Sequence, residues 1–381
     1  MPKPLPTISI ALATYNGSKF IEAQLQSLAD QDHLPIEIVI TDDGSTDDTL
    51  DRIATFARTA PFPIHIHRND DKLGYRKNFL KAAALCTAEI VAFCDQDDHW
   101  RPNKLNRVAE AFRDPEVFLV SHNAAVVDAT GNFIRPLNPE KAFPASIDAM
   151  DGSPWEFPFG FTTSFRSSLM AFLPLHETSL DPYHAGELLG HDQWVTLLAS
   201  ALGRKVYIED FLVDYRLHGA NTFGVSTEGG QSLFERLHLK IEDRSDVFGR
   251  LKRAARVNTT ILARVAASKG IAKIDARRAT QAAERWQSLS ELYELRTRAY
   301  TVGSIFERFG AVSRLAALNG YNDTGVWSFG RKSQARDLLL GVLAGPLITQ
   351  LGAKKSDRDA GLRALSPLPS SEPGLTPANQ R

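Results

Sequence analysis

Short apolar runs alternate with helix-like patterns along the first part of the chain. The runs Ile8–Leu12, Ile36–Ile40, Ile64–His67 and Glu89–Phe93 have the length and the β-branched or aromatic content of strands. Between them, apolar residues recur at helical spacing, as in the segment Ile21–Leu28. Repeated strand–helix–strand spacing predicts an α/β fold with a mostly parallel central sheet and helices on both faces.

Polar clusters directly follow three of these strands. They are Thr14–Asn16, Asp42–Ser45 and Asp95–Asp98. In a parallel sheet, ligands bind beyond the carboxyl ends of the strands, because those ends meet at one edge. The three clusters therefore predict a ligand site at that edge.

The pattern changes after about residue 115. Two strand-like stretches are followed by a loop rich in Pro and Phe, by a helix that starts near Gly190–Asp192, and by two more strand-like stretches. The strand-like stretches are 117–120, 124–127, 205–208 and 211–217, and the loop is 135–160.

The chain becomes helical and basic from about residue 226, and rich in Ser, Pro, Ala and Gly from about residue 353. We therefore expect an α/β domain over residues 1–224, a helical C-terminal element over 225–352 and a disordered tail over 353–381. The basic helices suit peripheral association with an anionic membrane surface, or form an ordinary solvated helix face; both interpretations stay open.

The composition is that of a globular protein with no dominant charge. The 381 residues carry a formal net charge of −1, so no overall field favours nucleic acid as a partner. Cys86 and Cys94 lie in apolar stretches, as buried reduced thiols do. The apolar stretch Leu338–Leu351 is interrupted by Gly and Pro and is too short for a membrane span. We expect a cytoplasmic location, at the inner face of the membrane if the basic helices dock there.

The acidic clusters have two interpretations when each is taken alone. Asp95 and Asp97 lie two residues apart just past a strand, so in extended chain their carboxylates face the same way and suit a hard divalent cation. Asp is also common in turns and at helix N-termini, which would make these residues structural. The same choice applies to Asp42–Ser45, a turn or an acceptor for a ligand's N–H and O–H groups.

Together, these elements resemble the family 2 inverting glycosyltransferases with the GT-A fold. The matching segments are Ile10–Gly17, Ile40–Asp47, Asn69 with Gly74 and Asn78, and Phe93–Trp100. Their order and spacing match as well as their residues, and the resemblance extends over roughly residues 6–224. No Gly-x-Gly-x-x-Gly follows the first strand, which disfavours a dinucleotide-binding fold.

The resemblance implies a nucleotide pocket and a metal site at the matched positions. Thr14, Tyr15 and Asn16 would line the nucleotide pocket, Asp43 would contact the base or ribose, and Arg76 or Asn78 would help to hold the nucleotide. Asp95 and Asp97 would form the DXD pair, with Asp97 as the direct ligand of Mg²⁺ or Mn²⁺. Asp98 would contact the sugar or a metal-bound water. The ion would offset the negative charge of the leaving diphosphate.

Asp192 stands where this family carries its catalytic base. An inverting displacement needs a carboxylate on the acceptor side to take the hydroxyl proton. The alternative is that Asp192 only caps the helix that begins there. Many members have Glu before this Asp, whereas this chain has His191. Further on, Arg216 and His218 share one face at strand spacing, and would contact phosphate oxygens and the metal or phosphate, respectively.

The Asp-Gln-Asp-Asp-x-Trp and Gly-His-Asp-x-Trp elements resemble bacterial rhamnosyltransferases and related enzymes of polysaccharide assembly. The resemblance implies a dTDP- or UDP-sugar donor and a glycan or lipid-linked acceptor. One rival interpretation is a sugar nucleotidyltransferase, although the loop after the first strand lacks a Gly-rich phosphate-binding pattern. A second rival is a non-catalytic binding module on a transferase scaffold.

Overall fold

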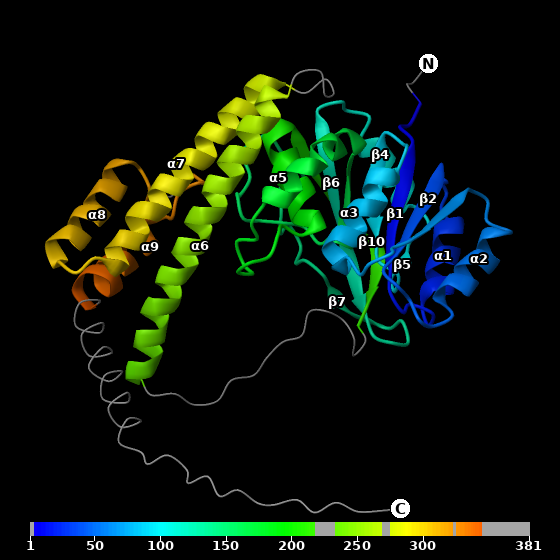
Figure 1. Cartoon of the computed structure of the whole chain (residues 1–381), viewed down its shortest axis with the longest axis horizontal. Helices are drawn as coiled ribbons and strands as arrows, with labels where there is room; N and C mark the ends of the chain where they lie inside the picture. The colour runs from blue at the N-terminus through cyan, green and yellow to red at the C-terminus, as the bar shows by residue number, and fades with distance from the viewer. Residues whose placement is uncertain (1–3, 218–232, 269–274, 323–324, 345–381) are drawn as a thin grey trace, which may run out of the picture.

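The computed structural model describes residues 4–217, 233–268, 275–322 and 325–344. The predicted domain boundary near residue 224 and the predicted tail 353–381 lie outside the described residues. Within the described part, an α/β domain is followed by a group of helices (Figure 1).

A single mixed sheet forms the centre of the α/β domain. Its strand order is β3-β2-β1-β4-β9-β6-β10-β5. The first four are mutually parallel: β1 (Ile8–Thr14), β2 (Glu37–Asp42), β3 (Ile64–Arg68) and β4 (Ile90–Cys94). The expected parallel arrangement therefore holds for this half of the sheet.

The other half of the sheet introduces antiparallel pairs. The short strand β9 (Thr163–Arg166) lies antiparallel between β4 and β6 (Val117–Val127), and β6 pairs in parallel with β10 (Arg204–Arg216). Three further short strands pair at the margins: β5 (His99–Trp100), β7 (Phe133–Pro136) and β8 (Ser146–Ile147).

Several expectations for this half need correction. The stretches 117–120 and 124–127 are one continuous strand, and so are 205–208 and 211–217, because the polar residues between them are accommodated within the ladder. The expected loop 135–160 contains β8. After the 3₁₀ turn η1 (Gly160–Thr162) and β9 comes a second 3₁₀ segment, η2 (Ser167–Thr178), which the sequence pattern did not indicate.

Alternation along the strands builds two cores. In β1, Ile10 and Leu12 face the side covered by α1 (Ile21–Ala29), α2 (Thr49–Ala57) and α4 (Lys104–Ala111), whereas Ala11 faces the other side. That second side is covered by α3 (Gly74–Leu85) and α5 (His191–Leu202). The helices on both faces fix the strand ends that carry the polar clusters.

The C-terminal helices pack on the outside of α5 (Figure 1). They are α6 (Leu233–Ala267), α7 (Ala276–Thr301), α8 (Ile305–Ala317), α9 (Arg331–Arg336) and the π-type segment η3 (Asp337–Ala344). They share one apolar core with α3 and α5. Polar contacts also join the two parts, since the Trp155 indole N–H donates to the Tyr293 hydroxyl at 3.0 Å and that of Trp327 to the Met150 carbonyl at 2.8 Å.

Among the described helices, none is both long and apolar enough to cross a membrane. Cys94 is buried and Cys86 half-buried, and both are free thiols, as expected.

Candidate functional site

The carboxyl ends of the parallel strands bring the predicted site residues to one rim of the sheet. Thr14 pairs with Asp42 at the ends of β1 and β2, and Leu12 of β1 pairs with Cys94 at the end of β4. The chain after each strand therefore leaves the sheet at the same level. Neighbouring strands are about 4.8 Å apart, so the turn after β2 and the turn after β4 lie roughly 10 Å from each other.

The turn after β2 is saturated with internal hydrogen bonds. The buried Asp42 carboxylate accepts from the Thr14 hydroxyl at 3.0 Å and from the backbone N–H of Gly44 and Ser45 at 3.1 and 2.9 Å. The Ser45 hydroxyl also donates to it. Gly44 has φ +86°, a conformation that glycine adopts without strain.

Asp43 is also engaged within the protein. Its carboxylate accepts from the Asn69 side chain at 2.9 Å and from the backbone N–H of Leu73 and Gly74 at 2.7 and 2.9 Å. These bonds hold the loop between β3 and α3 against the rim. The Asp43 carboxylate, which is predicted to contact the nucleotide, therefore also positions this loop.

The turn after β1 is fixed by contacts with its two neighbours. Asn16 has φ +48°, and its backbone N–H donates to the Ser45 hydroxyl at 2.9 Å. Gln96 exchanges two hydrogen bonds with the backbone of Tyr15, both at 3.1 Å. Tyr15 keeps an exposed ring, and the Lys72 ammonium lies 3.7 Å from the centre of that ring. The Tyr15 ring is therefore accessible at the rim, whereas hydrogen bonds hold the Tyr15 backbone in place.

Two other predicted nucleotide contacts lie inside the protein. The Asn78 side chain is buried and donates to the Thr41 carbonyl at 2.9 Å, which ties α3 to β2. Arg76 donates to the Asp181 carboxylate at 2.7 Å and to the Leu188 carbonyl. Arg76 therefore anchors the loop before α5, and its expected contact with the nucleotide stays a prediction.

Asp95, Asp97 and Asp98 form a tight cluster after β4. One carboxylate oxygen from each lies within 4.8 Å of the others. Burial and the negative charges of Asp97 and Asp192 raise the pKa of Asp95 to about 7. Asp98 is buried, and desolvation together with Asp95 and Asp97 raises its pKa well above the usual range. Its Oδ2 atom has no hydrogen-bond partner among the described residues.

A buried lysine lies under this cluster, and the sequence analysis did not identify it. Lys104 has no exposed surface; its ammonium donates to the Phe161 carbonyl at 2.9 Å and lies 3.4 Å from the centre of the Trp100 ring. Burial lowers its pKa to about 7, against the opposing effect of Cys94, Asp98 and Asp95. The available signal was helical spacing, because Lys104 lies four residues before the inward-facing Val108.

Asp192 lies in the first turn of α5. It contributes to the raised pKa of Asp95, so it is near the cluster, although it is not among the three residues that lie within 4.8 Å of one another. Its Oδ1 accepts from the Gln193 backbone at 2.8 Å. The Gln193 side chain in turn accepts from the Gly190 N–H at 2.6 Å. Asp192 therefore accepts a backbone N–H of the first turn of α5, and both its interpretations, base and cap, stay open.

His191, the neighbour of Asp192, is enclosed by aromatic rings. It stacks on Phe79 with ring centres 4.1 Å apart and meets Phe93 edge-on at 4.7 Å. Desolvation lowers its pKa to about 4, so the ring is neutral near pH 7. This residue fixes the start of α5 by packing, without adding charge beside Asp192.

Arg216 is the last residue of β10 and reaches the acidic cluster through its backbone N–H, which donates to Asp98. Its guanidinium lies 5.5 Å from the ring of Phe20. His218, the predicted extra metal or phosphate contact, lies outside the described residues.

The chemistry of this rim fits a divalent cation. Three carboxylates gather in a desolvated place, two of them have raised pKa values, and one buried oxygen lacks a partner. A hard cation prefers such oxygen ligands and would offset their mutual repulsion. The buried Lys104 lies beneath the acids, but its lowered pKa of about 7 limits the positive charge that it brings.

Comparison with known proteins gives the same family as the motifs. The family model described as Glycosyl transferase family 2 matches residues 9–171. An uncharacterised glycosyltransferase of Nostoc sp. is 31% identical over 219 residues, which cover 56% of this chain and 66% of the relative. A dTDP-rhamnosyl transferase of Shigella flexneri is 38% identical over 103 residues, 26% of this chain and 36% of the relative. The chain thus spans less than two thirds of the length of these relatives.

Solved structures with a similar arrangement have low sequence identity. Staphylococcus aureus TarS 1–349 in complex with UDP-GlcNAc is 17% identical with a TM-score of 0.45, covering 82% of this chain and 88% of that one. A mannosyltransferase of Pyrobaculum calidifontis in complex with GDP-Man and Mn²⁺ is 17% identical with a TM-score of 0.43, covering 92% and 88%. Scores this low do not relate individual residues.

Proposed function

We propose that the chain acts as a family 2 glycosyltransferase, on the match of residues 9–171 to that family model, and that it moves a sugar from a nucleoside diphosphate to an acceptor hydroxyl with inversion. The observation that carries this proposal is the cluster of Asp95, Asp97 and Asp98 at the sheet rim, with Asp192 near enough to raise the pKa of Asp95.

The proposed metal ligands are Asp97 and Asp95, with His218 as a further candidate. When bound, Mg²⁺ or Mn²⁺ would offset the negative charge of the departing diphosphate. Asp98 would then accept a hydrogen bond from the donor sugar or from a metal-bound water. The desolvated carboxylates and the buried oxygen of Asp98 support this assignment.

We assign the role of general base to Asp192. A base of an inverting displacement must lie on the acceptor side, separated from the metal ligands by the sugar that is transferred. The position of Asp192 beside the cluster but outside it supports this role. His191 keeps α5 in place and, being neutral, leaves the negative charge of Asp192 uncompensated.

The proposed nucleotide pocket is formed by the turns after β1 and β2. Thr14, Tyr15, Asn16 and Asp43 would surround the base and ribose, Arg216 would contact the diphosphate, and Arg76 and Asn78 would hold the surrounding loops. The likeness to a dTDP-rhamnosyl transferase supports a dTDP- or UDP-sugar donor. The acceptor would be a glycan or a lipid-linked glycan in the assembly of a cell-surface polysaccharide or glycolipid.

We also propose that the α/β domain extends to about residue 224 and that the helices after it dock on the cytoplasmic face of a membrane. Large apolar side chains are exposed on α8 and η3, which pack on each other: Phe306, Phe309, Leu339 and Leu343. The exposed cations Arg331 and Lys332 of α9 are near in sequence. Flotation with anionic vesicles tests this, since Phe306→Ser with Phe309→Ser should remain in the soluble fraction; equal flotation of both proteins would refute it.

A screen of nucleotide sugars tests the catalytic proposal. Thermal shift with and without Mn²⁺ should select one dTDP- or UDP-sugar, and the selected donor should lose its sugar in the presence of the enzyme. Release of pyrophosphate from a nucleoside triphosphate and a sugar phosphate would favour the nucleotidyltransferase rival instead. Donor binding that persists without turnover for any acceptor in a glycan panel, together with no effect of Asp192→Asn, would favour the binding-module rival.

A further inference from the structure

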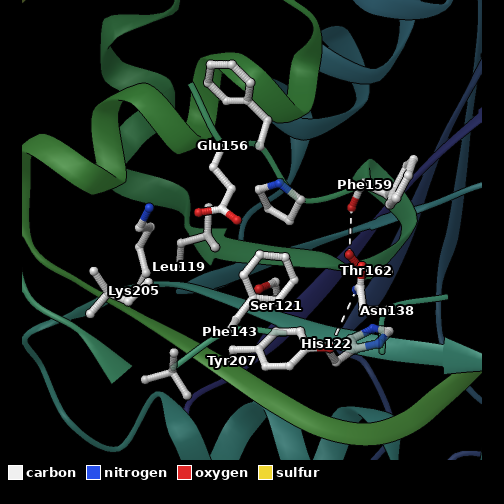
Figure 2. A pocket seen from close by; sticks show the side chains of 14 residues that line it. Leu119, Ser121, His122, Asn138, Phe143, Glu156, Phe159, Thr162, Lys205 and Tyr207 are labelled. Carbon is white, nitrogen blue, oxygen red and sulfur yellow. Dashed lines mark hydrogen bonds between the residues drawn. The ribbon is translucent and has the colours of Figure 1, made fainter. Parts of the chain in front are cut away.

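A second cavity opens on the α5 side of the sheet, away from the turns after β1 and β2 (Figure 2). The space inside it, together with the open solvent at its mouth, is about 600 Å³. One wall is the sheet, where Ser121 of β6 and Tyr207 of β10 are paired neighbours. The opposite wall is the segment Glu156–Phe159.

The lining combines aromatic rings with hydrogen-bonding groups. The rings of Phe143 and Tyr207 meet edge-on with centres 4.9 Å apart, and the Tyr207 hydroxyl accepts from the Asn138 side chain at 3.5 Å. Figure 2 shows Lys205 and Asn138 on opposite sides of the Phe143 ring, with the Glu156 carboxylate also facing the space. Rings flanked by donors and acceptors at their edges are what a sugar ring needs, because its faces carry C–H groups and its rim carries hydroxyls.

Lys205 brings a cation to this cavity. Its side chain is half-buried and lines the space together with Glu156. Burial lowers the pKa of the ammonium, and the charge of Glu156 opposes this. An ammonium in such a place donates hydrogen bonds that a sugar hydroxyl can accept.

The cavity is connected to the reaction centre by a short piece of chain. Phe159 and Thr162 line the cavity, and between them the Phe161 carbonyl accepts from Lys104, which lies under Asp95 and Asp98. β9 separates β6 from β4, so the cavity wall at Ser121 is two strand spacings, roughly 10 Å, from the strand that leads to Asp95. The same piece of chain also lies against the start of α5. Gly160 is so close to the His191 ring that a Cβ there would be 2.2 Å from Nε2.

The C-terminal helices support the outer wall of this cavity. Trp155, next to Glu156, packs edge-on against Trp286 of α7 with ring centres 4.9 Å apart and donates to Tyr293. The wall is therefore held by a different part of the chain from the nucleotide turns. A ligand in this cavity can be recognised without touching those turns.

We propose that this cavity binds a sugar ring of the acceptor glycan. The inference rests on the proposed transferase function and assigns the acceptor side of that site to Ser121, Phe143, Lys205 and Tyr207. Lys205 and Glu156 hold hydroxyls at one end, Asn138 and Tyr207 at the other, and Phe143 packs on the ring. The apolar part of any lipid-linked acceptor stays outside.

Saturation-transfer NMR with methyl and hexyl glycosides of glucose, galactose, mannose and rhamnose tests the proposal on the full chain. Lys205→Met removes the ammonium, and Ser121→Phe fills the cavity. Lys77→Met, at a surface lysine of α3 whose ammonium pairs with Glu177 at 3.0 Å, is the matched control. Binding of dTDP and UDP is measured in parallel by titration, and folding by thermal denaturation.

At least one glycoside should bind through its sugar protons, and Lys205→Met should weaken that binding about tenfold, the effect of losing one charged hydrogen bond. Ser121→Phe should abolish it. Nucleotide binding should change by less than about twofold in both variants, and Lys77→Met should match the unsubstituted chain in glycoside binding. If one of the two cavity variants is unfolded, glycoside binding by the other variant decides whether the cavity is the binding site.

The proposal is overturned if no glycoside binds to a chain that binds nucleotide, if both cavity variants keep normal glycoside binding, or if the hexyl chain receives more saturation than the sugar. Failure of the proposed function has a different signature, because then neither dTDP nor UDP binds with any metal. Glycoside binding that persists in that case would leave a sugar-binding cavity without a transferase.

Discussion

Two acidic turns lie about 10 Å apart on the same rim, and they differ in how their charges are satisfied. In the turn after β2, Asp42 and Asp43 each accept at least three hydrogen bonds from nearby donors. In the turn after β4, Asp95 and Asp98 are desolvated beside like charges, and their pKa values rise. The first turn is complete as folded, whereas the second would gain from a cation. On the proposed function, the first turn is therefore scaffold and the second belongs to the reaction centre.

Removing an acid from the second turn should have the largest effect on activity. Asp97→Ala is expected to lower turnover by about 10³-fold or more, because the metal contributes several kcal/mol to stabilising the leaving group. Metal-enhanced nucleotide binding should be lost as well. Asp32→Ala, an exposed acid before β2, serves as the control in steady-state assays. Turnover within tenfold of the unsubstituted chain would remove Asp97 from the metal site.

Asp192→Asn should lower turnover by about 10²- to 10⁴-fold, the range for loss of a general base. Donor and metal affinity should be unchanged in titrations, because Asp192 lies outside the cluster. Gln193→Ala is the matched control for a purely structural role, since it removes the other side-chain hydrogen bond at the start of α5. If both variants lose activity and stability to the same extent, Asp192 acts through the helix and is not the base.

For stability, the larger effect is expected in the turn after β2, and not in the turn after β4. Asp42→Ala should lower the free energy of unfolding by about 3 kcal/mol, because it leaves several buried donors without an acceptor. Asp98→Asn in metal-free protein should leave it unchanged or raise it, because an amide cannot take the charge that burial beside Asp95 and Asp97 disfavours. Urea unfolding with a chelator measures both. Equal losses in the two variants would mean that the turns are alike in their energetics.

The raised pKa of Asp95 gives a pH dependence of known sign. The folded metal-free chain binds this proton up to about pH 7, whereas the unfolded chain releases it near 3.8. The stabilisation from the bound proton is present at low pH and is lost as pH rises through 7. Asp95→Asn should therefore gain about 1–2 kcal/mol relative to the unsubstituted chain between pH 5 and pH 8. Histidines with lowered pKa values are common to both proteins and cancel in the difference.

Urea unfolding at pH 5, 6, 7 and 8 with a chelator measures that difference. A constant difference across the range would show that the Asp95 carboxylate is ionised and solvated throughout. Added Mn²⁺ should reduce the trend between pH 5 and pH 7, because the cation replaces the proton.

The sequence was sufficient to place the acidic clusters on one rim, because strand–helix–strand order forces the parallel strand ends together. It could not tell which acids are satisfied. The donors for Asp43 come from residues 69, 73 and 74, and their approach depends on how the loop before α3 folds back. The sequence did not indicate the role of Lys104 for a similar reason. A lysine on the inward face of a helix can be assigned as buried only when the residues that contact it are known. The strand β9 has four residues, too few for a periodic signal.

Gln96 lies in the turn after β4 and binds the turn after β1. Its substitution should give the smallest effect on activity. Its side chain exchanges two hydrogen bonds with the Tyr15 backbone, and no Cβ fits at Gly17, where it would meet Gln96 Oε1 at 2.1 Å. Gln96→Ala removes both bonds but no charge, so the KM for the donor should rise about fivefold, equivalent to roughly 1 kcal/mol, with kcat nearly unchanged. Gln26→Ala, an exposed glutamine of α1, is the control. A fall in kcat with constant KM would mean that Gln96 acts on the reacting groups, and the division between a scaffold turn and a reactive turn would then have to be drawn elsewhere.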